Sequence, residues 1–208
     1  MTRTLLCYGD SNTHGTPPMP HLDFEGRHAP GDRWPNVMAA ALPDWTVIAE
    51  GHPGRTTVHD DPLEGAHKNG LTVLPAILES HCPLDLVIVK LGTNDLKARY
   101  ALPAQDIAFG AGKLVDCIRR LQPQAAVLLV APPPITESGC LAEMFGGGAA
   151  KSARLPALYA IEAKRQGAHF LDAGAHIAVD PVDGIHYALA AHHILGGVIA
   201  AEIRRLWP

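Results

Sequence analysis

The sequence lacks the charge excess and the long apolar runs that mark several classes of protein. Its 17 Lys and Arg residues against 21 Asp and Glu residues give a net charge of −4, and the basic residues are scattered along the chain. This balance offers no electrostatic footprint for nucleic acid or for an anionic membrane surface. No apolar run approaches the length needed to cross a bilayer. We therefore expect no nucleic-acid partner and no membrane association.

Metal-ligand and disulfide motifs are also missing. The 12 His residues include no H-E-x-x-H or H-x-x-x-H pair, and the four Cys residues show no C-x-x-C spacing. Cys7 lies in an apolar stretch, where it acts as a small hydrophobe rather than as half of a disulfide. No leader-like segment precedes that stretch. The sequence predicts a cytoplasmic protein with no metal and no cofactor.

The chain has instead the length and the apolar content of one globular domain over residues 1–208. It is 47% apolar and 18% charged, which excludes a disordered chain. Five apolar runs predict strands at 4–8, 45–49, 84–91, 125–131 and 169–171. Helices are expected between and after them, at 34–42, 71–81, 107–121, 149–167 and 187–206. This alternation predicts an α/β fold, a three-layer α/β/α sandwich around a five-stranded parallel sheet.

Prolines limit two of these helices. Pro75 fits the helix at 71–81 only if that helix begins near the proline. Pro156 is tolerated in the helix at 149–167 only near its first turns or at a kink.

Two long loops are expected. The Pro-rich segment 13–32 is a loop of the kind that serves function or assembly, and the Gly-rich segment 136–148 is expected to be a lid or a contact loop.

The first expected strand runs directly into Gly-Asp-Ser at 9–11. Asp10 and its two successors are good helix N-cap types, so a helix should begin there. Ser11 then lies at the carboxyl edge of the sheet, where open α/β sheets place their ligands. The free N–H groups of a helix start can stabilise a developing negative charge. The structural alternative is that Ser11 only caps the helix.

Three later loops carry residues that complement Ser11. They contain Gly54, Asn94, and Asp183 with His186, and each loop follows an expected strand of the same sheet. The i, i+3 spacing of Asp183 and His186 would place carboxylate and imidazole on one face of a helical turn. A serine nucleophile needs an adjacent base, and the base needs an orienting group. The pattern therefore predicts His186 as the base for Ser11 and Asp183 as its orienting carboxylate.

The same edge offers donors for an oxyanion. The candidates are the backbone N–H groups of Ser11 and Gly54 and the side-chain amide of Asn94. Each residue alone has a structural alternative as a turn or cap residue. His192 and His193 are rival bases without a carboxylate at matching spacing, and Asp180 is a rival orienting group.

In combination these motifs resemble the SGNH hydrolases, also called GDSL-like esterases, over nearly the whole chain. The matching blocks are Gly-Asp-Ser at 9–11, the turn at 51–54, Gly-Thr-Asn-Asp at 92–95 and Asp-Gly-Ile-His at 183–186. The resemblance implies a flavodoxin-like sheet and serine esterase chemistry. A narrower resemblance, through 55–62, 84–88, 91–97 and 182–186, is to the bacterial arylesterase and acyltransferase branch that includes a mycobacterial acyltransferase. Resemblance to that branch implies that the chain assembles as a homo-oligomer with a narrow pocket for short acyl groups. It also implies that an alcohol competes with water for the acyl group.

The sequence thus predicts a serine ester hydrolase that cleaves small short-chain acyl esters through an acyl-enzyme on Ser11. A carbohydrate acetylesterase with the same machinery is an alternative, because the polar Asn12 and His14 are expected at the pocket mouth. Two other classes remain open. One is an inactive ligand-binding module of the same fold. The other is a phosphate- or nucleotide-binding domain, which Asp10 disfavours because its charge would repel phosphate.

Overall fold

A computed structural model describes residues 2–207, and its centre is a parallel β-sheet. The strands are β1 (Arg3–Gly9), β2 (Trp45–Gly51), β3 (Leu86–Lys90), β4 (Ala126–Ala131) and β5 (His169–Asp172). Their order is β2-β1-β3-β4-β5, and every neighbouring pair is parallel. This is the strand order of flavodoxin-like folds. The predicted α/β fold with a five-stranded sheet is confirmed.

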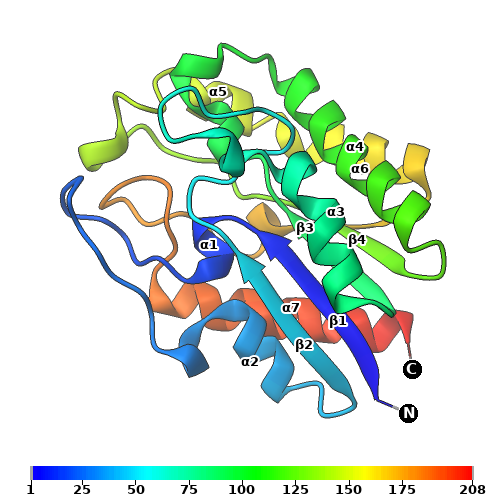
Figure 1. Ribbon diagram of the computed structural model, residues 1–208. Helices are drawn as coiled ribbons and strands as arrows, with labels where there is room; N and C mark the ends of the chain where they lie inside the picture. Colours follow the sequence, from blue (N-terminus) through cyan, green and yellow to red (C-terminus); the bar gives the residue numbers. More distant parts are fainter. Residues whose placement is uncertain (1, 208) are drawn as a thin grey trace.

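Helices cover both faces of the sheet (Figure 1). α3, α4 and α6 pack on one face around a large apolar core, and α2 and α7 pack on the other face around a smaller one. The helices are α1 (Ser11–His14), α2 (Trp34–Ala40), α3 (Gly70–His81), α4 (Ala104–Leu121), α5 (Gly148–Ser152), α6 (Leu155–Gln166) and α7 (Leu189–Leu206). Within residues 2–207, none of these helices has the length and apolar character to cross a membrane.

The central strand β3 is buried at all five of its positions. A Leu/Val/Ile run of this kind is typical of a parallel strand that helices cover on both faces. Its side chains alternate between the two cores, with Val87 and Val89 on the α3/α4/α6 face and Leu86 and Ile88 on the α2/α7 face. The sheet thereby provides a rigid edge from which the loops after β1, β2 and β3 project.

The helix expected at 71–81 is present, but the expectation that it begins near Pro75 was wrong, and so was the expectation of one continuous helix at 149–167. α3 begins at Gly70, so Pro75 lies inside it rather than at its start. The Asn69 side chain accepts hydrogen bonds from the N–H groups of Leu71 and Thr72, and this cap establishes the first turn ahead of the proline. The expected helix at 149–167 is two helices, and Pro156 lies in the first turn of α6, where its missing N–H needs no partner.

Candidate active site

The turn after β1 places Ser11 at the carboxyl edge of the sheet. Asp10 is the N-cap of α1, and its Oδ1 accepts a hydrogen bond from the N–H of Asn12 at 3.0 Å. Ser11 is the first residue of that helix, so its own N–H has no partner inside the helix. Its side chain lines the pocket described below. The local sequence therefore presents the hydroxyl and the free N–H of Ser11 side by side.

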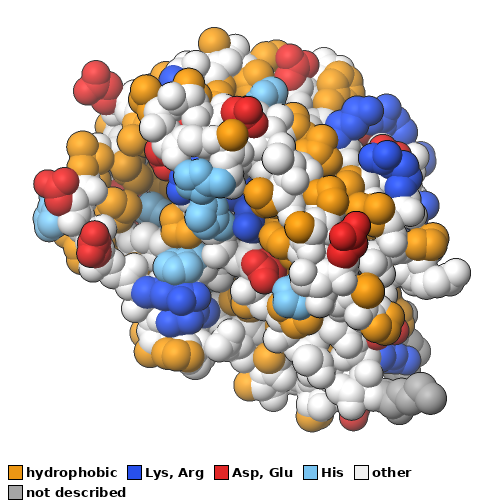
Figure 2. Space-filling model, viewed as in Figure 1, with side chains coloured by type: hydrophobic (Ala, Val, Ile, Leu, Met, Phe, Trp, Pro, Cys, Tyr) orange, Lys and Arg blue, Asp and Glu red, His pale blue; other side chains and the backbone are white. Residues whose placement is uncertain are grey.

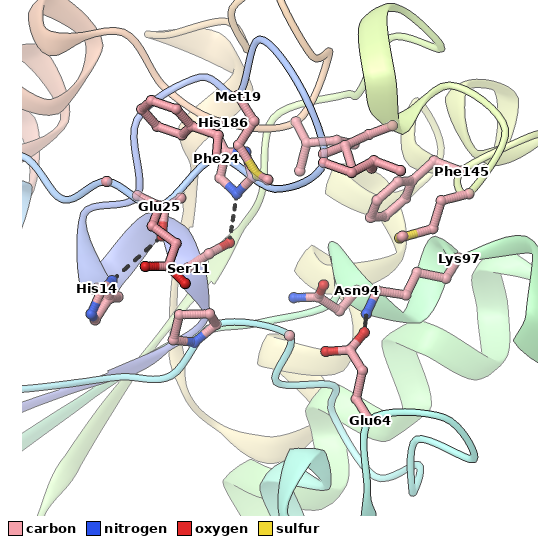
Figure 3. Close-up of a pocket in the computed structure, with 18 residues that line it drawn as sticks. Ser11, His14, Met19, Phe24, Glu25, Glu64, Asn94, Lys97, Phe145 and His186 are labelled. Carbon is pink, nitrogen blue, oxygen red and sulfur yellow. Dashed lines mark hydrogen bonds and ion pairs between the residues drawn. The ribbon is translucent and has the colours of Figure 1, made fainter.

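His186 connects Ser11 to Asp183. Its Nε2 lies 3.0 Å from Ser11 Oγ, and its Nδ1 lies 2.6 Å from Asp183 Oδ2. All three side chains are buried, with His186 5% exposed and Ser11 7% exposed. Figure 3 shows the imidazole above the serine, joined to it by a dashed line. A short Nδ1 contact to a carboxylate keeps hydrogen on Nδ1 and leaves Nε2 free to accept the serine proton.

The expectation of a helical turn at 183–186 was wrong, although the two side chains do meet. Residues 183–186 form a turn between β5 and α7. Asp183 Oδ1 accepts hydrogen bonds from the N–H groups of Ile185 and His186, each at 2.9 Å. Gly184, at φ +74°, packs so closely that a Cβ would lie 2.0 Å from the carbonyl oxygen of Thr136. The carboxylate itself, and not helical periodicity, folds the turn that presents the imidazole.

The Asp183 carboxylate is held in its charged form. Its Oδ2 accepts a further hydrogen bond from the N–H of Met19 at 2.7 Å. Burial alone would raise the pKa of Asp183, but the hydrogen bond and charge of His186 and the backbone donors outweigh burial and lower that pKa. A charged carboxylate at this place stabilises the imidazolium that forms when His186 takes a proton.

Gly54 and Asn94 supply donors beside the serine. Gly54 has φ +80°, a left-handed conformation that favours glycine. Within residues 2–207, the Gly54 N–H has no acceptor. The Asn94 amide donates one hydrogen to the carbonyl of Arg55 at 3.1 Å, which leaves its second hydrogen for another acceptor. Figure 3 shows this amide directed toward the serine side of the pocket.

Arg55 and Asp95 hold these loops together, and sequence reasoning assigned them no role. The Arg55 guanidinium donates to the carbonyl of Gly9 at 2.9 Å and lies 4.2 Å from the ring centre of Tyr8. The buried Asp95 carboxylate accepts hydrogen bonds from the backbone and hydroxyl of Thr57. Arg55 directly follows Gly54, and Asp95 directly follows Asn94. This adjacency to predicted site residues is the sequence signal that could have identified them. They join the loops after β1, β2 and β3 into one unit.

Four of the predicted site residues, Ser11, Gly54, Asn94 and His186, line a pocket of about 470 Å³. Asp183 is not part of the lining and contacts the Nδ1 side of His186. Figure 3 shows the lining of the pocket, and Figure 2 shows a hollow on this face with histidine side chains gathered beside it. The two expected loops both contribute walls, the first through residues 14–26 and the second through residues 141–145. The apolar part of the wall consists of Met19, Leu22, Phe24, Pro53, Leu141, Met144, Phe145 and Ile185.

Charged side chains occupy part of the same wall. Lys97 donates a hydrogen bond to Glu64 Oε1 at 2.7 Å, and Arg99 donates to the same oxygen at 2.9 Å. Burial raises the pKa of Glu64, but Lys97 outweighs this effect, so the net pKa is lowered and the carboxylate is charged. Glu25 and His14 line the pocket nearer the serine. The pocket therefore presents both apolar and hydrogen-bonding groups to a ligand.

The rival residues lie elsewhere. His192 is fully buried between α7 and α2, where its Nδ1 accepts a hydrogen bond from the N–H of Trp34 at 3.3 Å. His193 pairs with Asp32 at 2.9 Å on the surface. Asp180 accepts the N–H of Val182 instead of orienting His186. Asn12, expected at the pocket mouth with His14, is buried and absent from the pocket lining. No set of three or more His, Cys, Asp and Glu side chains within residues 2–207 could hold a metal ion.

Comparison with known proteins identifies relatives of the whole chain. Residues 7–194 match the model of the GDSL-like lipase/acylhydrolase family. The carbohydrate acetylesterase Est24 from Sinorhizobium meliloti is 40% identical over 99% of this chain and 100% of its own, with a TM-score of 0.95. The aryl esterase of M. smegmatis is 39% identical over 98% of this chain and 99% of its own, with a TM-score of 0.94. No curated protein matches the chain significantly.

Proposed function

This chain belongs to the GDSL-like lipase/acylhydrolase family and is an ester hydrolase, and from that premise we propose that Ser11, His186 and Asp183 are its catalytic triad. The observation that carries the proposal is the position of His186, between Ser11 Oγ at 3.0 Å and Asp183 Oδ2 at 2.6 Å. The substrate is a small ester of a short-chain acid. The pocket of about 470 Å³ around the serine has the size that such a ligand needs.

The first half of the reaction forms an acyl-enzyme. Ser11 Oγ attacks the ester carbonyl while His186 Nε2 takes its proton, and Asp183 stabilises the resulting imidazolium. The tetrahedral oxyanion accepts hydrogen bonds from the N–H groups of Ser11 and Gly54 and from the amide of Asn94. When the intermediate collapses, the imidazolium gives its proton to the leaving alcohol. The acyl group is then bound to Ser11 Oγ.

The second half releases the acid. A water molecule attacks the acyl carbonyl, and His186 Nε2 removes one of its protons. The same three donors stabilise the second oxyanion, and the proton on His186 returns to Ser11 Oγ as the carboxylic acid leaves. Each residue is thereby restored to its starting state.

Ser11→Ala tests the proposal directly. Turnover of p-nitrophenyl acetate should fall at least about 10⁴-fold, because removal of one triad member leaves only the residual catalysis of the oxyanion hole and binding. The matched control is Ser80→Ala, since Ser80 is exposed on α3. It should keep the wild-type rate. Equal turnover by Ser11→Ala and wild type, with the fold intact, would overturn the proposal.

Carbohydrate acetylesterase activity is a second candidate. The side chains of His14, Glu25, Glu64 and Lys97 in the pocket wall favour it, because they can hydrogen-bond the hydroxyl groups of a sugar. Est24, at 40% identity, is described as a carbohydrate acetylesterase. A higher kcat/KM for acetylated xylo-oligosaccharides than for phenyl acetate would favour the sugar substrate. The reverse order would favour an aryl acetate.

Three finer expectations stay predictions. The first is that an alcohol competes with water for the acyl-enzyme, which product analysis in water–alcohol mixtures would test. The second is that the chain assembles as a homo-oligomer, and size-exclusion chromatography with light scattering would report its mass. The third is a cytoplasmic location, which cell fractionation would test.

A further inference from the structure

Lys90 is a charged residue in the interior of the protein. It is the last residue of β3, the middle strand of the sheet, and its side chain is 0% exposed. In the sheet register Lys90 lies opposite Gly9, so its backbone borders the turn that carries Asp10 and Ser11. The side chain points to the α2/α7 face, where the ammonium lies 4.6 Å from the ring centre of Tyr187. None of the catalytic steps above uses this residue.

The ammonium of Lys90 belongs to a group of buried polar atoms without partners. Within residues 2–207, no hydrogen-bond partner reaches Lys90 Nζ, Asp10 Oδ2, Tyr187 Oη or His192 Nε2. Each of these residues is at most 1% exposed. Three of them are neighbours, since Tyr187 lies against both the ammonium and His192, whose ring centre is 5.6 Å from that of the tyrosine. Asp10 follows Gly9, which is the register partner of Lys90 on the adjacent strand β1. Burial lowers the pKa of the Lys90 ammonium, and the negative charge of Asp10 opposes that shift.

The hydrogen-bonding capacities of these groups are complementary. Lys90 offers three hydrogens and Asp10 Oδ2 accepts. His192 Nδ1 accepts from Trp34, so its Nε2 carries a hydrogen and donates. Burial lowers the pKa of His192 to about 3, which keeps this ring neutral. Buried polar groups that protein atoms leave unpaired are generally bridged by ordered water, and an unpaired buried charge is far more costly than a bridged one.

We propose that ordered water bridges Lys90 to Asp10 beneath the nucleophile, and that Lys90 is thereby a positioning residue for Ser11. Asp10 links the two sites, because its Oδ1 caps the helix that begins at Ser11 while its Oδ2 is buried and accepts no hydrogen bond from the residues 2–207 that the structure describes. The pair also balances charge. An Asp10 carboxylate without a counter-charge, one residue from Ser11, would oppose the oxyanion that forms there. The positive charge of Lys90 offsets that opposition.

This inference rests on the proposed function, and kinetics of paired variants test it. Lys90→Met should lower kcat for p-nitrophenyl acetate on the order of tenfold, as expected for one uncompensated charge near the oxyanion, with KM within about twofold. Asp10→Asn keeps a capping side chain but removes the negative charge. The double variant, Asp10→Asn with Lys90→Met, should recover most of the loss because neither charge remains. Lys113→Met, an exposed lysine on α4, is the matched control and should be unchanged.

Two outcomes would overturn the inference. One is wild-type kcat in Lys90→Met. The other is a double variant whose kcat falls as far below that of Asp10→Asn as the kcat of Lys90→Met falls below that of wild type, which would show that the two residues act independently. Phosphonate titration of every variant counts the reactive serines. If wild type carries one reactive Ser11 and Lys90→Met is nevertheless unaffected, this inference fails while the proposed triad stands.

A measurement on the wild-type protein covers the case in which Lys90→Met does not fold. A crystal structure at about 1.2 Å resolution should show ordered water within hydrogen-bond distance of both Lys90 Nζ and a second member of the group, Asp10 Oδ2 first. Density that shows a direct contact between Lys90 and Asp10, or a dry space between them, would overturn the bridge.

Discussion

Replacement of Asp183 by asparagine is the substitution whose effect follows most closely from the geometry. The side chain is 0% exposed and accepts hydrogen bonds on both oxygens. Oδ1 accepts from two backbone N–H groups of its own turn, so an asparagine must place its oxygen there. Its NH₂ group then takes the place of Oδ2, where it faces the N–H of Met19 and Nδ1 of His186. The asparagine amide is a hydrogen-bond donor at the position where the Asp183 carboxylate accepted from Met19 and His186.

This exchange forces the wrong tautomer on His186. If Nδ1 must accept from the amide, Nε2 carries the hydrogen and cannot take the proton of Ser11. In Ser-His-Asp hydrolases of an unrelated fold, the same substitution lowers kcat about 10⁴-fold. We expect a loss of about 10³- to 10⁴-fold here, which corresponds to about 4–5.5 kcal/mol of transition-state stabilisation. The free energy of unfolding should fall by about 1–3 kcal/mol, because Met19 loses its acceptor.

Steady-state kinetics with p-nitrophenyl acetate and urea denaturation measure the two effects. The matched control is Asp180→Asn, since Asp180 lies three residues away and its side chain, among residues 2–207, accepts only the N–H of Val182. It should stay within about threefold of wild type in kcat. The reasoning is refuted if Asp183→Asn keeps more than about a tenth of the wild-type kcat, or if the control is equally damaging.

Three further predictions concern the oxyanion and the pH dependence of stability. Asn94→Ala should lower kcat about 10²- to 10³-fold with little change in KM, because its amide serves the transition state, and a change confined to KM would contradict that role. His192 has a folded pKa of about 3 against about 6.5 unfolded, so wild-type stability should fall as the pH drops from about 6.5 toward 3. The urea midpoint of His192→Gln should fall less over this pH range than that of wild type, whereas the midpoint of exposed His193→Gln should fall as much as wild type. Parallel curves for His192→Gln and wild type would refute the prediction. Asp61→Asn should lower the free energy of unfolding at pH 7 by about 1–3 kcal/mol, because Lys97 and Arg99 lose a buried acceptor and keep only the partly exposed Glu64 as a counter-charge. Its folded pKa is lowered, so the difference from wild type should shrink as the pH falls below about 4, and a constant difference would contradict the assignment.

The sheet was predictable because its signals are local. Strand β3 is an uninterrupted apolar run, and β1 ends in Gly-Asp-Ser, so both the buried strands and the loops after them follow from short segments. All parallel strands end at one edge, which brings Ser11, Gly54 and Asn94 to the same pocket. The start of α3 was less predictable. It depends on the side-chain conformation of Asn69, which caps the helix ahead of Pro75.

The detailed support of the site was not predictable from the same signals. The contact between Met19 and Asp183 joins residues 164 positions apart, and no periodicity encodes it. The turn at 183–186 has the right spacing for a helix but folds around the Asp183 carboxylate instead. Lys90 stands in an apolar strand whose pattern does not reveal that its ammonium lies against the ring of Tyr187. These contacts depend on packing between distant segments, which a single sequence does not specify.

The location of a covalent adduct tests the central claim most directly. The protein is treated with a p-nitrophenyl phosphonate ester, and the site of modification is found by peptide mass spectrometry. The account predicts one adduct per chain, on Ser11, formed much more slowly in His186→Ala and not at all in Ser11→Ala. An adduct on another residue, with ester turnover lost in proportion to it, would contradict the account.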